Sequence, residues 1–161
     1  MAMELFHRNK ESRVEWDEKG GAFVVRVDML DRFHDMGVRV VFSYPDLVIR
    51  SVEPRMDRTP YPVCPDALAR AAECVGMKVQ AGLQLMMNRT IGGPEGCTHV
   101  TQLVLDACHA AVQGLLAIQS ARGGETVYQI PADEKIAFLE ARGLALRDSC
   151  TAYSSARRAQ G

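Results

Sequence analysis

Three of the five cysteines stand where a thiol could do chemistry. Cys64 stands between Pro62 and Pro65 in the stretch "PYPVCP", at the predicted start of a helix, and Cys97 follows the loop "GGPEG" at the predicted start of a longer one. Cys150 lies in "LRDSC", near the C-terminal end. The first turn of a helix carries unpaired backbone N–H groups and the positive end of the helix dipole, and both favour thiolate over thiol. Because a thiolate binds metals and attacks electrophiles, these cysteines are candidate ligands or nucleophiles.

Two histidines could complete such a site. His99 stands two residues after Cys97, a spacing at which both side chains can reach one cation, and His34 lies at a predicted strand start beside Asp35, which could orient its ring. We therefore expect Cys64, Cys97 and Cys150 to bind a metal, with His34 or His99 as a further ligand. Thiolate and imidazole ligands suit zinc or an iron–sulfur cluster.

The remaining cysteines and histidines have simpler interpretations. Cys74 and Cys108 fall on the apolar faces of predicted helices, where a free cysteine packs as a small hydrophobic residue. His109 falls on the polar face of a helix, and His7 lies in the N-terminal stretch. We expect none of these four in the site.

The composition limits the class of protein. The chain has 161 residues, 47% hydrophobic and 24% charged, with a formal net charge of −1, which gives no electrostatic case for binding nucleic acid or an anionic membrane. It contains no signal-peptide pattern, so we expect a cytoplasmic protein with reduced cysteines. We expect one domain over residues 1–161 with an ordered core of about 12–150. A client or partner protein is the expected partner, and the oligomeric state is left open.

The elements that must position these residues are strands followed by helices. Alternating β-branched and aromatic residues with short connections predict an antiparallel meander of four strands, over 12–16, 22–30, 36–44 and 47–56. Pro54 favours an edge position for the last strand or a bulge within it. Helical periodicity predicts helices over 66–75, 80–91, 98–121 and 131–142. This order indicates an α+β fold, in which three to four helices cover one face of the sheet.

The order of motifs resembles a known family. "HDM", "PYPVCP", "GCTHV" and "LRDSC", in this order over Val14 to Tyr153, are similar to an uncharacterised bacterial family, the domain of unknown function 2889. The last segment differs from the family pattern, in which a histidine follows the cysteine, because Thr151 and Ala152 follow Cys150 here. The resemblance implies that His34, Cys64, Cys97, His99 and Cys150 belong to one set. It implies no activity.

A second resemblance concerns architecture. Antiparallel strands, a cysteine, helices and a cysteine that opens a helix look like the iron–sulfur scaffold proteins of the IscU and NifU type. Such proteins hold a cluster or zinc with three cysteines, and this likeness would give those parts to Cys64, Cys97 and Cys150, with His34 or His99 as the fourth ligand.

Three functions are compatible with these residues. The first is a metal-binding accessory or scaffold-like protein. The second is a thiol-dependent enzyme, in which Cys97 attacks an electrophile such as a thioester and His34 is the better candidate base. The third is a non-catalytic module that binds a small molecule with Met77, Met86, Met87 and Tyr61. Whether the chain is an enzyme is left open.

Overall fold

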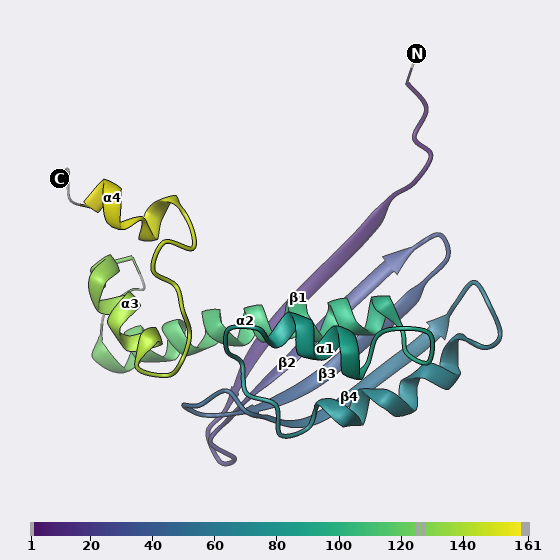
Figure 1. Cartoon of the computed structure of the whole chain (residues 1–161), viewed down its shortest axis with the longest axis horizontal. Coiled ribbons are helices and arrows are strands. Elements are labelled where there is room, and N and C mark those ends of the chain that lie inside the picture. The colour runs from purple at the N-terminus through teal and green to yellow at the C-terminus, as the bar shows by residue number, and fades with distance from the viewer. Residues whose placement is uncertain (1, 125, 127, 159–161) are drawn as a thin grey trace.

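The computed structural model describes residues 2–124, 126 and 128–158 of the chain. Its centre is a four-stranded antiparallel sheet in the order β1-β2-β3-β4, as Figure 1 shows. The strands are β1 (Arg8–Asp17), β2 (Ala22–Asp31), β3 (Asp35–Ser43) and β4 (Ile49–Arg58). The predicted meander and α+β class are confirmed, and β4, which carries Pro54, is an edge strand as expected.

One face of the sheet forms the core. In β2 the side chains of Phe23, Val25 and Val27 occupy every second position and are fully buried. In β3 the core positions have the opposite parity, with Val40 opposite Val25 and Phe42 opposite Phe23 in the antiparallel register. Because side chains alternate along a strand, this register places all of them on one face, while charged residues between them, such as Arg26 and Arg39, lie on the other face.

Helices cover this apolar face. In chain order the covering helices are η1 (Cys64–Cys74), α1 (Leu83–Thr90) and α2 (Thr98–Gly123). Three further helices follow them, namely α3 (Ala132–Glu140), η2 (Thr151–Tyr153) and α4 (Ser155–Arg158). The long helix α2 packs across β1, β2 and β3, η1 packs beside β4, and α1 contacts both α2 and η1. The first covering helix is a 3₁₀-helix rather than the expected α-helix, and it begins at Cys64.

Helix α2 supplies most of the helical core. Leu103, Ala107, Ala111 and Leu115 are fully buried against the sheet. At Gly114 the helix comes so close to the sheet that a Cβ atom would lie 2.6 Å from Val14 Cγ1. Among the described helices, α2 alone is long and apolar enough to cross a membrane, and the sequence did not predict such a helix. However, 56% of its most apolar window is buried inside this fold. A helix whose apolar stripe packs on a sheet meets the same two criteria.

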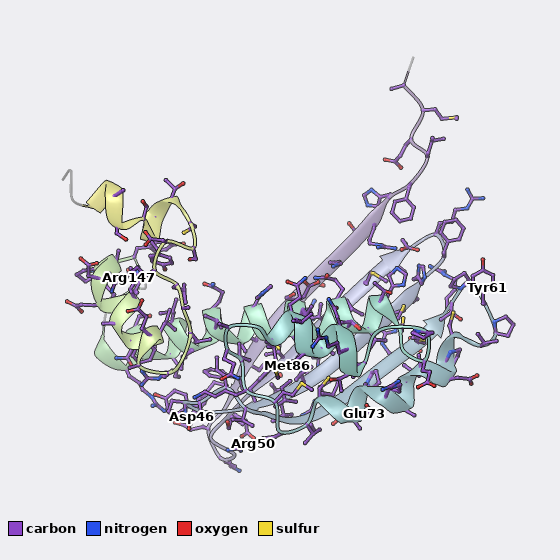
Figure 2. The ribbon with its side chains drawn as sticks, in the orientation of Figure 1. Asp46, Arg50, Tyr61, Glu73, Met86 and Arg147 are labelled. Atoms are coloured by element: carbon purple, nitrogen blue, oxygen red, sulfur yellow. The ribbon has the colours of Figure 1, made fainter. Side chains whose placement is uncertain are left out.

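The two ends of the molecule carry different elements. The β2–β3 hairpin, the segment after β4 and the first turn of α2 lie at one end, as Figure 1 shows. The last turns of α2 extend toward α3, η2 and α4 at the other end. In Figure 2 Tyr61 and Arg147 mark these two ends.

Candidate functional site

The hairpin between β2 and β3 fixes the position of His34. Asp31 Oδ1 accepts hydrogen bonds from the backbone N–H groups of Phe33 (2.7 Å) and His34 (2.8 Å), and the Asp31 N–H donates to the His34 carbonyl (2.9 Å). An aspartate that bonds the backbone two and three residues ahead closes a tight turn. On the far side, Arg58 Nη2 donates to the Asp31 carbonyl at 2.6 Å and holds the hairpin against the end of β4.

The carboxylate of Asp31 is buried and charged. Arg8 Nε lies 2.7 Å from Asp31 Oδ2, and its Nη2 lies 2.6 Å away, so the carboxylate has a cation as partner. Burial alone would raise the pKa of Asp31, but hydrogen bonds from the Phe33 amide, from Arg8 and from His34 outweigh it and hold the pKa well below its usual range. Asp31 is therefore ionised throughout the physiological pH range.

This charge fixes the tautomer of His34. The ring Nδ1 lies 3.1 Å from Asp31 Oδ1 and 3.2 Å from Oδ2. Because an ionised carboxylate only accepts hydrogen bonds, Nδ1 carries a proton and donates it to Asp31. In the neutral ring Nε2 then keeps its lone pair. Nε2 has no hydrogen-bond partner in the described part of the chain, and it is accessible to solvent.

His99 stands beside this ring. It lies in the first turn of α2, is half-buried, and its ring centroid is 4.3 Å from that of His34 with an interplanar angle of 48°. Burial lowers its pKa, and the nearby charges of His34, Arg8 and Lys10 lower it further, while Asp31 acts in the opposite direction. His99 is thus biased toward the neutral form, with no hydrogen bond from its ring to any described residue.

The orienting carboxylate differs from the expected one. We predicted that Asp35 orients His34, but Asp35 lies at the start of β3 and pairs with Arg55 at 3.0 Å. Asp31 takes the role because the hairpin folds the ring of His34 back over the residue that closes the turn. The spacing of three residues in "DRFH" is the signal that could have indicated this pair, because it is the spacing of a side chain that caps a turn.

Two of the predicted cysteines share a surface hollow. Cys64, at the first position of η1, and Cys97, at the N-cap of α2, both line a hollow of about 300 Å³ together with Asp66 and Glu95. Both thiols are partly exposed. Two segments that are 33 residues apart in the chain (97 − 64) thus meet at one place.

Tight packing of the loop before α2 holds Cys97 in place. The Cys97 N–H donates to the Ile91 carbonyl at 3.1 Å, and a Cβ atom on Gly96 would lie 2.1 Å from the same carbonyl oxygen. Only glycine fits there, because the loop backbone lies directly on the end of α1. The side chain of Cys97 makes no capping hydrogen bond, so its sulfur accepts none from the backbone N–H groups of the first turn of α2.

Cys150 stands apart from these residues. It is exposed and precedes η2, in the segment that lies at the opposite end of the molecule from the first turns of η1 and α2 (Figure 1). The structure therefore brings His34 to His99, and Cys64 to Cys97, but Cys150 to neither pair. Over residues 2–124, 126 and 128–158, no three histidine, cysteine, aspartate or glutamate side chains are arranged to hold one metal ion.

The two cysteines expected to pack in the core do so. Cys74 and Cys108 are both buried. Burial raises the pKa of the Cys74 thiol to about 11 and that of the Cys108 thiol to about 12. His109 is exposed on α2, as expected for a residue on the polar face of a helix, and His7 is exposed before β1.

The fold and site define a small α+β domain that places a histidine pair and a cysteine pair at one end of its sheet. The chain belongs to the family described as protein of unknown function (DUF2889), whose model matches residues 14–113. The match begins at Val14 as predicted but ends well before Tyr153, so it includes His34, Cys64, Cys97 and His99 and leaves out Cys150. No curated protein and no solved structure matches this chain. The likeness to iron–sulfur scaffold proteins stays a prediction.

Proposed function

We propose that this chain is a metal-binding accessory protein in which His34 and His99 are the ligands to a zinc ion. The observation that carries the proposal is the Asp31–His34 hydrogen bond, which occupies Nδ1 and leaves Nε2 of His34 without a hydrogen-bond partner among the described residues, beside the ring of His99. A carboxylate behind a histidine is the usual partner of a metal-bound imidazole, since it fixes the tautomer and raises the basicity of the ligating nitrogen. Imidazole suits zinc and neighbouring divalent metals.

The arrangement supports an open site rather than a closed one. Structural zinc sites use four protein ligands, whereas the described residues offer no group of three. Water or groups from a client would fill the remaining positions, which fits an accessory role. An iron–sulfur cluster is less well supported than zinc, because such clusters take four cysteines as a rule and the segment that carries Cys150, just before η2, lies at the other end of the fold.

Zinc titration of the reduced protein tests the proposal. Isothermal calorimetry at pH 7.5 would compare the wild type with His34→Ala and His99→Ala. The matched controls are His109→Ala on the same helix as His99, and His7→Ala, because both of these rings are exposed and lie outside the pair. We expect each site substitution to weaken zinc binding about tenfold or more, because even the loss of a hydrogen-bond partner of a metal ligand lowers metal affinity by that factor. The control variants should bind zinc as the wild type does.

Cobalt spectra separate imidazole from thiolate ligation. Cobalt(II) in place of zinc gives a strong near-ultraviolet band only when a thiolate binds it. We expect no such band in the wild type. If the wild type shows this band and the Cys97→Ser variant does not, Cys97 is also a ligand. Zinc affinity that is equal in the wild type, His99→Ala and His109→Ala, with native circular dichroism in all three, would refute the proposal.

Thiol chemistry at the second pair is an alternative function. It is favoured by the hollow that Cys64 and Cys97 share, because a hollow between two partly exposed thiols can admit an electrophile. Alkylation of metal-free protein by iodoacetamide, followed site by site with mass spectrometry across pH, tests it. A reactive nucleophile should be modified at Cys97 or Cys64 well below the pH at which the exposed Cys150 reacts. Equal pH profiles at all three cysteines would contradict the enzyme hypothesis.

A further inference from the structure

Exposed apolar side chains gather around the hairpin that carries His34. They come from three segments that the sheet register brings to one end, because Arg8 pairs with Asp31 and Asp35 pairs with Arg58. Their members are Leu5, Phe6, Leu30, Phe33, Tyr61 and Val63. Single exposed apolar residues need no explanation, but several of them at one end of a fold are typical of a surface that binds something.

A hollow lies within this group. It measures about 480 Å³ and lies between the segment before β1 and the hairpin, with Phe6 and Leu30 among its walls. The ring of Phe6 stacks on that of Phe33 at 6.5 Å between centroids, which ties the N-terminal segment to the hairpin. Its volume falls in the range of sites for small molecules.

Two guanidinium groups give the hollow a charge preference. Arg32 and Arg58 both line it. Arg58 is held by the carbonyls of Asp31 and His34, and the Arg32 side chain makes no ion pair with any residue in the described part of the chain. The third nearby arginine, Arg8, is already neutralised by Asp31.

The acidic groups of the hollow do not cancel this preference. Glu4 lines the wall, and Asp31 is bound by Arg8 and by the hairpin, so one free carboxylate faces two cations. His7 is the remaining titratable side chain of the wall. The hollow as a whole is therefore cationic and apolar at once.

We infer that this hollow binds a small carboxylate with an apolar body. The carboxylate would pair with Arg32 and Arg58, since a guanidinium is the side chain best shaped for a carboxylate, and the apolar body would cover Phe6 and Leu30. The inference goes beyond zinc binding and does not depend on it. It is distinct from simple anion binding, because an anion without an apolar part would leave the exposed rings in water.

Octanoate is a suitable probe for the full-length protein. Binding would be measured by nuclear magnetic resonance titration of ¹⁵N-labelled protein without added metal, with octanol and inorganic phosphate as the two comparison ligands. The site variants are Arg32→Gln and Leu30→Ser. Their matched controls are Arg89→Gln and Leu85→Ser on α1, because Arg89 is also an exposed arginine without an ion pair to a described residue and Leu85 is also an exposed leucine.

We expect saturable shifts of the amides of the hairpin and of the segment before β1 with octanoate. Each site variant should weaken this binding about fivefold to tenfold, the loss for one charge-assisted contact or one apolar wall, while both controls bind as the wild type does. Octanol and phosphate should bind more weakly than octanoate. The inference is overturned if octanoate shows no saturable binding, or if octanol or phosphate binds as tightly as octanoate. It is also overturned if both site variants bind octanoate with wild-type affinity.

Discussion

The charged Asp31 carboxylate should contribute more to stability than any other acidic group at this end of the sheet. Its side chain is fully buried and accepts hydrogen bonds from two backbone amides, from Arg8 and from His34. Asp31→Asn keeps the shape and one acceptor oxygen but removes the charge and turns an NH₂ group toward Arg8 or His34. The Arg8 guanidinium, 30% exposed, would lose its partner.

The magnitude follows from these contacts. Hydrogen bonds to a charged group contribute about 1.5–3 kcal/mol each, and breaking a buried ion pair costs about 3–5 kcal/mol. Because Arg8 can turn to water and the asparagine oxygen can still accept the amides, we expect a loss of about 2–4 kcal/mol in the free energy of unfolding at pH 7. Urea unfolding followed by circular dichroism measures it.

The pH dependence gives a second test with a definite sign. The folded-state pKa of Asp31 is depressed, so its stabilisation is complete above the pKa of an unfolded aspartate, about 3.9, and is lost as the pH falls below that value. The difference between the wild type and Asp31→Asn should therefore shrink by up to about 1.4 kcal/mol per pH unit below pH 4.

A control substitution identifies the result that would refute this reasoning. Glu15→Gln removes a carboxylate that is 60% exposed and pairs with Arg26, where an exposed pair contributes about 0.2–1 kcal/mol. If Asp31→Asn costs no more than Glu15→Gln at pH 7, the buried carboxylate is not the anchor of the hairpin.

Three further predictions concern packing and thiol reactivity. Gly114→Val should destabilise the protein by about 1–3 kcal/mol in urea unfolding, because its side chain would clash with Val14 and Phe23, whereas Gly123→Ala, with open space at its Cβ, should be neutral or stabilising. Arg122→Ala should cost about 0.5–2 kcal/mol in the same assay, since Arg122 stacks on Trp16 and Tyr44; no loss relative to Arg89→Ala would contradict this. In the native protein at pH 8, iodoacetamide should modify Cys64, Cys97 and Cys150 but not Cys74 or Cys108, and mass spectrometry gives the number of modified cysteines. If Cys74 and Cys108 react as fast in the native protein as in urea, they are not buried.

Much of the fold followed from local patterns. The alternation in β2 and β3 and the turn residues between them predict both the strands and their antiparallel pairing, because period two places Phe23, Val25 and Val27 on one face. Pro54 correctly placed β4 at an edge. The 3₁₀ form of η1 was not predicted, since the apolar spacing that brings Ala71 and Cys74 to the core suits either helix type.

The sequence alone determined which residues carry reactive groups and which of them start helices or pack in the core. Cys97 at the N-cap of α2, Cys64 at the start of η1 and the burial of Cys74 and Cys108 all follow from neighbours close in the chain. Such features depend on local periodicity and turn residues, which the sequence displays directly.

Only the tertiary structure decided which of these residues meet. The pairing of β1 with β2 brings Arg8 to Asp31, and the packing of α2 on the sheet brings His99 to His34, while Cys150 is carried to the opposite end by the segment after α2. These distances depend on how the sheet and α2 pack over many residues, and no local pattern in the chain encodes them.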